Sequence, residues 1–395
     1  NPASGEYYYH FFYKEQPDLN WKHPEVRKAM FEVVRFWLEM GVDGFRLDAV
    51  GTIFEDPALT DQTSPLDQEG LYQAFRLATD EEERKRLGEI GEDLYKHQHD
   101  RPEVHQLMKE LRKVVDEFED RVLIGETDDL QFYGNGQDEL DLVFNFPLMR
   151  TNRLTAGWVR ENQKERLAGL PNGAWPCNTL NNHDSGRVWS NFGDGVNDEA
   201  LAKLSLAVVL LLKGTPCLYN GEEIGMRNFL GFRLDEFRDP ISRRVYDLEQ
   251  RLLGINEAEA LEFAARNGRD KGRTPYQWDG TDNGGFCPAG VRSWLPVSAD
   301  YLNGVNLAEQ TARKNSVWNF YRNLLHLRRT TPALIEGDYQ AIEMSENVLG
   351  FLRQSMTQSI LVWLNFEGRA RMGLVEAGLT SARRVFYSQE DGAEE

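Results

Sequence analysis

The chain has 395 residues, which is enough for one large domain with an appendage or for two to three smaller domains. Its 45 Lys and Arg residues are outnumbered by 64 Asp and Glu residues, so the formal net charge is −19. A field of that sign repels phosphate backbones, and nucleic acid is therefore not an expected partner. The longest apolar run, at residues 204–212, is far shorter than the roughly 20 residues that a membrane span needs, so we expect no membrane segment.

Aromatic residues and cysteines also narrow the class of protein. Aromatic residues make up 11% of the chain, and their flat apolar faces suit sugar rings, although most of them in any globular protein belong to the core. The 3 cysteines, at positions 177, 217 and 287, are too few for a disulfide framework and are expected to be free thiols. The composition favours a soluble protein that acts on neutral or cationic small molecules.

Helices and strands are predicted to alternate along the first part of the chain. In chain order the sequence predicts a helix at 23–40, a strand at 42–48, a helix at 104–118, strands at 121–126, 142–146 and 177–182, a helix at 198–213 and a strand at 215–219. The helices carry apolar residues at helical spacing, and the strands are short apolar runs. This alternation predicts a parallel sheet wrapped by helices.

The later part of the chain has a different character. From 222 to about 303 it is rich in charge and Gly, which predicts a long loop excursion of the kind that shapes a pocket. A helix follows at 316–329, and beyond Pro332 the helical period disappears. Apolar runs at 349–353, 360–366 and 383–387 then predict antiparallel strands of a small separate domain, while the charge run at 80–86 predicts a solvated helix face.

Acidic residues follow three of the predicted strands. Asp48 and Glu126 end two of them, and the strand at 177–182 runs into His183 and Asp184. In a (β/α)8 barrel the carboxyl ends of the strands build the active site, so these acids have a structural reason to converge. Each acid taken alone could equally start a loop or cap a helix.

Arg46 and Asp48 are expected to share one face of their strand, because residues i and i+2 point the same way. A neighbouring Arg lowers the pKa of an Asp and keeps it ionised, as a carboxylate nucleophile requires. Glu126 as a general acid must instead be protonated near neutral pH, which requires a less polar position and a raised pKa. The alternative interpretation is a buried ion pair at the end of the sheet.

His183 beside Asp184 could belong to a metal site or to a nucleophilic triad. None of the other six histidines stands at ligand spacing from this pair, so we expect no metal site in this sequence.

Several motifs in this order resemble those of the alpha-amylase family, glycoside hydrolase family 13. Three of its signature motifs are matched by GFRLD at 44–48, IGE at 124–126 and NHD at 182–184. QPDLN at 16–20 and RTPYQW at 273–278 are similar to stretches typical of its alpha-glucosidase and oligo-1,6-glucosidase branch. The resemblance implies an α/β fold, the second half of a (β/α)8 TIM barrel with about five strands, followed by a small antiparallel β C-terminal domain.

The resemblance also implies a domain division. Residues 1–21 would end an inserted domain, 22–331 would form the barrel portion with the excursion at about 222–303, and 332–395 would form the C-terminal β domain. An early family motif with an Asp and an Asn-His pair has no match here. We therefore expect the chain to be a piece that lacks the N-terminal part, and to be neither stable nor active as a monomer by itself.

For the chemistry, the resemblance implies a retaining mechanism with Asp48 as nucleophile and Glu126 as acid and base, their carboxyl groups about 5 to 5.5 Å apart. Asp184 would be the third acid and would hold the ring hydroxyls of the sugar. Three further residues would line the substrate site: Arg46, His183 and Arg273. Because Arg273 would close the site around the non-reducing glucose, exo-action on short oligosaccharides is expected.

The sequence also gives predictions for linkage specificity, partners and cellular location. Ala49 stands where 1,6-preferring members tend to carry Val, which favours alpha-1,4 or mixed specificity. Two alternatives stay open: a transglucosidase or sugar isomerase with the same acids, and a non-catalytic amylase-like subunit of a transporter. We expect an alpha-glucoside as small-molecule partner, no cofactor, and a cytoplasmic location. A structural calcium ion, a targeting segment and a separate N-terminal chain would all concern residues upstream of Asn1.

Overall fold

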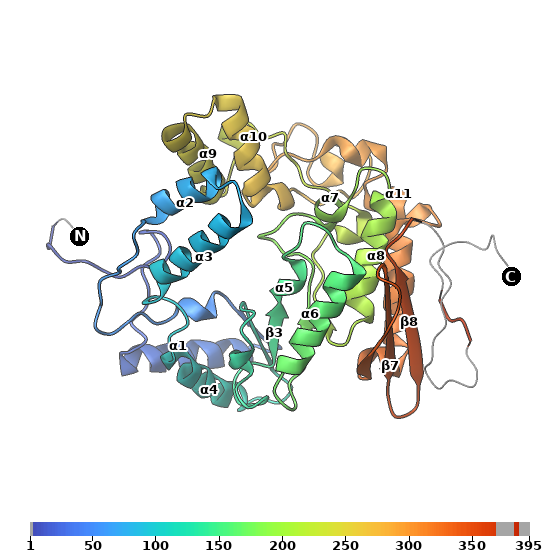
Figure 1. Ribbon diagram of the computed structural model, residues 1–395, viewed down its shortest axis with the longest axis horizontal. Coiled ribbons are helices and arrows are strands. Elements are labelled where there is room, and N and C mark those ends of the chain that lie inside the picture. The colour runs from blue at the N-terminus through green and yellow to red at the C-terminus, as the bar shows by residue number, and fades with distance from the viewer. Residues whose placement is uncertain (1–2, 369–382, 387–395) are drawn as a thin grey trace. The chain divides into compact units, whose positions relative to one another are not determined.

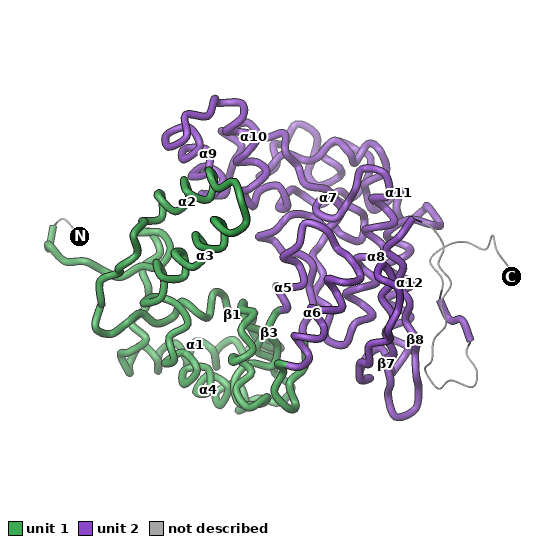
Figure 2. Tube along the Cα trace, viewed as in Figure 1, with its two compact units in different colours: residues 1–144, 169–176 green, residues 145–168, 177–395 purple. Residues whose placement is uncertain are grey.

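The computed structural model describes residues 3–368 and 383–386. The chain folds into two compact units (Figure 2), of which unit 1 holds residues 1–144 and 169–176 and unit 2 holds residues 145–168 and 177–395. No helix in the described part of the chain is long and apolar enough to cross a membrane.

Unit 1 is built on three short parallel strands and four helices. The strands are β1 (Gly44–Leu47), β2 (Val122–Gly125) and β3 (Leu142–Asn145), and the helices are α1 (Pro24–Glu39), α2 (Gln68–Leu77), α3 (Glu81–Tyr95) and α4 (Glu103–Val115). β2 pairs with both of its neighbours. Its Gly125 lies opposite Leu47 of β1, and its Ile124 lies opposite Leu142 of β3. The carboxyl ends of β1 and β2 therefore lie next to each other.

Local sequence signals explain the long helices of unit 1. α1 begins at Pro24, which suits a first helical turn, and it ends before Gly41, whose φ is +96°. α4 lies beside α1 (Figure 1) and buries its apolar stripe, including Leu107 and Met108, against the strands. The charge run at 80–86 lies in α3 and its side chains are largely exposed, which confirms the predicted solvated face.

Unit 2 contains a parallel strand pair, an antiparallel sheet and most of the helices. The parallel strands are β4 (Cys177–Asn178) and β5 (Thr215–Pro216), and the antiparallel strands are β6 (Asp338–Ile342), β7 (Val348–Gln354) and β8 (Ser359–Asn365). The helices are α5 (Phe146–Met149), α6 (Ala156–Gly169), α7 (Val188–Phe192), α8 (Asp198–Leu211), α9 (Pro240–Leu253), α10 (Glu257–Asn267), α11 (Leu307–Ala312), α12 (Val317–Arg329) and α13 (Pro332–Ile335).

The core of unit 2 joins α8 and α12 to the antiparallel sheet. α8 is apolar on nearly every side, as a helix buried within a core must be. Arg353 of β7 is fully buried, and its guanidinium donates to the carbonyl oxygens of Leu211, Leu212 and Gly337 at 2.8–2.9 Å. A strand residue thereby satisfies the last carbonyls of α8, which an α-helix leaves unpaired.

The fold prediction is confirmed: five short parallel strands, three in unit 1 and two in unit 2, precede a three-stranded antiparallel sheet. The strand predicted at 177–182 ends already at Asn178, because the Thr179 hydroxyl donates to the carbonyl of Asn181 at 2.6 Å and the chain turns. The predicted domain boundaries at 21/22 and 331/332 stay predictions.

Two expectations need correction. The excursion at 222–303 is not all loop, because it contains the helices α9 and α10, which lie side by side (Figure 1). The third antiparallel strand is β6, whose half-exposed, polar sequence gives little signal. In the strand predicted at 383–387, residues 383–386 have no regular secondary structure, and Tyr387 lies outside the described residues.

Candidate active site

Two acids stand side by side at the carboxyl ends of β1 and β2. The backbone N–H of Glu126 donates to the Leu47 carbonyl at 2.9 Å, which extends the pairing of the two strands to the acid itself. The Arg46 guanidinium forms an ion pair with Asp48 through Nη1 and with Glu126 Oε1 through Nη2, the latter at 2.9 Å. One Arg thus bridges both carboxylates, although Asp48 lies in the turn after β1 and not on the strand face that the sequence predicted.

The residue after Asp48 holds the second oxygen of Glu126. Ala49 has a φ of 40° and a ψ of 47°, a left-handed conformation that is uncommon outside Gly. In this conformation its N–H donates to Glu126 Oε2 at 3.0 Å. The backbone strain at position 49 therefore aims a donor at the candidate acid.

The two acids differ in environment. The Asp48 side chain is 77% exposed, whereas that of Glu126 is 20% exposed. Burial raises the pKa of Glu126, and the neighbouring Asp48 carboxyl raises it further, while the Ala49 N–H and the Arg46 charge act in the opposite direction. The result is a carboxyl that tends to keep its proton beside an accessible carboxylate.

In unit 2 the turn after β4 carries the third acid. Asp184 Oδ1 accepts from Arg273 Nη2, lies 3.3 Å from Arg269 Nη1 and lies 3.5 Å from His183 Nε2. Arg273 also donates through Nε to the carbonyl of His183 at 2.7 Å. The turn is therefore held by two guanidinium groups that come from one segment, 269–273.

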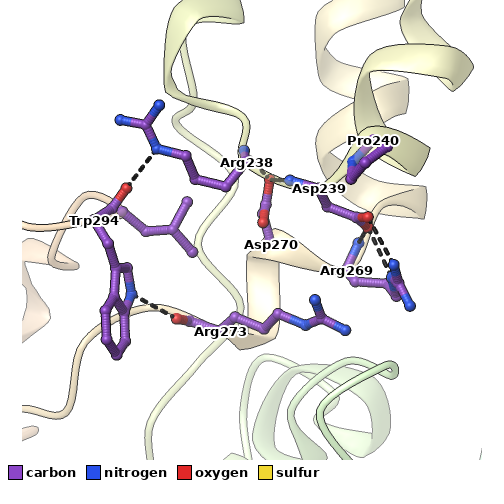
Figure 3. A pocket seen from close by; sticks show the side chains of 8 residues that line it. Arg238, Asp239, Pro240, Arg269, Asp270, Arg273 and Trp294 are labelled. Atoms are coloured by element: carbon purple, nitrogen blue, oxygen red, sulfur yellow. Dashed lines mark hydrogen bonds and ion pairs between the residues drawn. The ribbon is translucent and has the colours of Figure 1, made fainter. Parts of the chain in front are cut away.

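Arg269 is anchored from behind by a buried carboxylate. Asp239, whose side chain is fully buried, accepts from Arg269 Nε at 2.9 Å and from Nη2 at 2.8 Å (Figure 3). Burial alone would raise the pKa of Asp239, but the bidentate Arg269 bonds and the Ile241 N–H outweigh burial, and the pKa lies below its ordinary value. A charged Asp239 keeps Arg269 in place beside Asp184.

A pocket of about 450 Å³ opens next to these groups (Figure 3). Its lining joins charged side chains to one large aromatic ring: Arg238, Asp239, Pro240, Arg269, Asp270, Arg273, Trp294 and Leu295. The indole N–H of Trp294 donates to the Arg273 carbonyl at 3.2 Å, and 60% of the residue is exposed. A polar rim with an exposed aromatic face suits a hydroxyl-rich ring.

The residues predicted from the sequence form two groups. Arg46, Asp48, Ala49 and Glu126 come together in unit 1, and His183, Asp184 and Arg273 come together in unit 2; their catalytic and binding roles stay predictions. No sequence pattern indicated Arg269, Asp239 or Trp294. Arg269 stands four residues before Arg273 and Asp239 precedes a Pro at the start of α9, but neither signal identifies the partner.

Within the described residues no group of three or more His, Cys, Asp or Glu side chains gathers as metal ligands would. That the protein needs no cofactor stays a prediction.

Comparison with known proteins identifies the family. The model of the alpha-amylase catalytic domain matches residues 1–337. The chain belongs to the alpha-amylase family. The five parallel strands, three of which lead to a candidate acid, are therefore strands of an alpha-amylase catalytic domain.

Several relatives of this alpha-amylase family chain are named as glucosidases. An oligo-1,6-glucosidase of Parageobacillus thermoglucosidasius is 32% identical over 381 residues, covering 92% of this chain and 64% of the relative. A probable alpha-glucosidase of Rhizobium meliloti is 32% identical over 378 residues, covering 94% and 63%.

Among solved structures, the trehalulose synthase of Pseudomonas mesoacidophila MX-45 is 31% identical with a TM-score of 0.76, covering 93% of this chain and 64% of that one. The chain thus spans 63–64% of the length of these relatives.

Proposed function

We propose that the protein is a retaining, exo-acting alpha-glucosidase that hydrolyses short alpha-glucosides. The observation that carries the proposal is the pair of unlike carboxyl groups, exposed Asp48 and largely buried Glu126, bridged by Arg46. Retaining glycosidases need one ionised and one protonated carboxyl group on either side of the bond that breaks. The raised pKa of Glu126 supports the acid role.

In the proposed reaction Asp48 attacks the anomeric carbon while Glu126 donates its proton to the leaving oxygen. The glycosidic bond breaks, and the glucosyl group is held by an ester to Asp48. Glu126, now ionised, takes a proton from water, and that water displaces Asp48 from the anomeric carbon with overall retention. Arg46 favours the charged form of Asp48 at the start and end of the cycle.

For Asp184 we propose the role that the resemblance implies, which is to hold ring hydroxyls of the sugar. Asp184, held by Arg269 and Arg273, offers carboxylate oxygens to ring hydroxyls. The resemblance assigns Arg273 to closing the site around the non-reducing glucose, and the adjoining pocket with Trp294 offers an aromatic face to a neighbouring ring. A site closed in this way favours exo-action on short oligosaccharides.

The test replaces the nucleophile in the full natural protein. Asp48→Asn is expected to abolish hydrolysis of p-nitrophenyl alpha-glucoside while circular dichroism shows an intact fold. Asp43→Asn is the matched control, because Asp43 precedes the same strand and its side chain is 95% exposed. An Asp48→Asn variant with wild-type turnover would rule out the assignment, and NMR of the first product anomer distinguishes retention from inversion.

A second candidate is favoured by the likeness to trehalulose synthase. The same acids can pass the glucosyl group to a sugar acceptor instead of water, which would make the protein a transglucosidase or a sugar isomerase. Product analysis from maltose and from sucrose separates the two: free glucose as the main product supports hydrolysis, and a rearranged disaccharide supports isomerisation.

Linkage preference is proposed from Ala49. The small side chain beside Asp48 leaves volume near the leaving group, so alpha-1,4 or mixed specificity is expected, with maltose turned over at least as fast as isomaltose. Ala49→Val is expected to shift the ratio towards isomaltose and to lower stability, because a β-branched side chain is strained at the left-handed φ of 40°. A strong preference of the natural protein for isomaltose would contradict this prediction. The name oligo-1,6-glucosidase indicates a 1,6 preference for the relative that carries it.

A further inference from the structure

A buried carboxylate in unit 2 takes no part in the proposed reaction. Glu222 follows β5, and its side chain is 5% exposed. Its Oε1 accepts from Asn181 Nδ2 at 2.6 Å, and its Oε2 accepts from the backbone N–H of Val188 at 3.2 Å. The two donors stand immediately before and shortly after the turn that carries His183 and Asp184.

The surroundings of Glu222 are built to keep this carboxylate in place. Arg187 Nη1 lies 3.5 Å from Glu222 Oε1, and the guanidinium also stacks on the Tyr219 ring at 4.5 Å. A Cβ at position 221 would lie 2.9 Å from Arg187 Nη1, so Gly221, with a φ of +93°, is the residue that leaves room for this pair.

Besides Glu222, the guanidinium groups of Arg269 and Arg273 tie this turn to the segment 269–273. Asp184 N donates to Asn182 Oδ1 at 2.9 Å and Asn182 N donates to Ser185 Oγ at 2.9 Å, which are bonds internal to the turn. Burial raises the pKa of Glu222 to about 7, while Arg187, Asn181 and the Val188 N–H oppose burial and stabilise the charged form. A buried charge held by three donors is a rigid anchor, and losing its charge weakens all three bonds.

We propose that Glu222 is a positioning residue: its carboxylate ties Asn181 to Val188 and thereby fixes the turn that presents His183 and Asp184 to the sugar. This proposal rests on the proposed function in one respect, namely that Asp184 binds a sugar.

The test compares Glu222→Gln with Glu223→Gln in the full natural protein. Glu223 is the matched control, because its carboxylate accepts from the Tyr276 hydroxyl at 2.7 Å and from Gly221 N at 2.8 Å, away from the turn. Calorimetric titration with 1-deoxynojirimycin measures affinity and stoichiometry separately. Glu222→Gln is expected to weaken binding and to lower kcat/KM for p-nitrophenyl alpha-glucoside at least tenfold each, with unchanged stoichiometry, whereas Glu223→Gln stays within twofold.

A merely structural role would lower the stoichiometry, through misfolded protein, and leave the affinity of the folded fraction unchanged; that result would overturn the proposal. Amide hydrogen exchange at residues 182–187 gives a readout independent of activity, and exchange at least tenfold faster in Glu222→Gln alone is expected. If the natural protein neither hydrolyses alpha-glucosides nor binds the inhibitor, the proposed function fails, and the exchange data still decide whether Glu222 holds the turn.

Should Glu222→Gln fail to fold, Asn181→Ala decides, because it removes one tie and keeps the pair of Glu222 with Arg187. Faster exchange in the turn and weaker inhibitor binding are expected in this variant as well. Wild-type exchange and affinity in Asn181→Ala would overturn the proposal.

Discussion

At the scale of single residues, the position of Glu126 lowers the stability of the folded protein near neutral pH. Burial and the Asp48 carboxyl raise its pKa, although the Ala49 N–H and Arg46 partly compensate. A group whose pKa is higher in the folded than in the unfolded chain favours folding when it is protonated. Its contribution to stability is therefore complete below the unfolded pKa and is lost as the pH rises through the folded pKa.

Glu126→Gln, which removes an ionisable group from that position, is therefore expected to stabilise the protein near neutral pH. The melting temperature is expected to rise by about 1 to 3 °C there, with the gain disappearing towards pH 4, where the unfolded chain also protonates its Glu residues. Activity on aryl alpha-glucosides is expected to be lost. Calorimetric melting at both pH values tests the prediction, and an equal or lower melting temperature at neutral pH would contradict it.

At the scale of elements, the pairing of β1 with β2 decides whether the two acids meet. Gly44 begins β1 with a φ of +151°, and a Cβ at this position would overlap the carbonyl oxygen of Val122 on β2. The close approach lets the register of these strands place Asp48 beside Glu126. Gly is needed here by the neighbouring backbone and not only by the local turn.

Gly44→Ala is therefore expected to lower the free energy of unfolding by about 2 to 4 kcal/mol and to abolish activity, because β1 must move away from β2. Gly41→Ala provides the comparison: its φ is +96°, but nothing lies within 4 Å of a Cβ there. That variant is expected to lose only about 1 to 2 kcal/mol and to stay active. Urea unfolding and initial rates measure both, and equal effects of the two substitutions would refute the role given to the strand contact.

At the scale of the whole molecule, the described residues hold five short parallel strands, in two compact units, whereas a (β/α)8 barrel has eight. We therefore predict that these 395 residues, expressed by themselves, hydrolyse no aryl alpha-glucoside and show no single cooperative melting transition. The protein as its natural host makes it is the positive control. A cooperative transition together with glucosidase activity from the 395 residues would disprove this prediction.

The candidate acids could be predicted from the sequence because their placement follows from local periodicity. An acid directly after a buried strand lies at its carboxyl end, and Asp48 follows the last residue of β1 in this way. A helix start with Pro and a helix end with Gly are equally local signals, which is why α1 agrees with the prediction. The order of the motifs along the chain also predicted the family, and the match over residues 1–337 confirms that prediction.

Other features were decided only by the tertiary structure, because they depend on partners far apart in sequence. Asp239 meets Arg269 across 30 positions, and Asn181 meets Glu222 across 41 positions. Burying a charged group is unfavourable unless donors surround it, and which donors do so depends on how the loops pack. The sequence by itself therefore determined which acids could react, and the packing of unit 2 decided which side chains hold the turn of Asp184 in place.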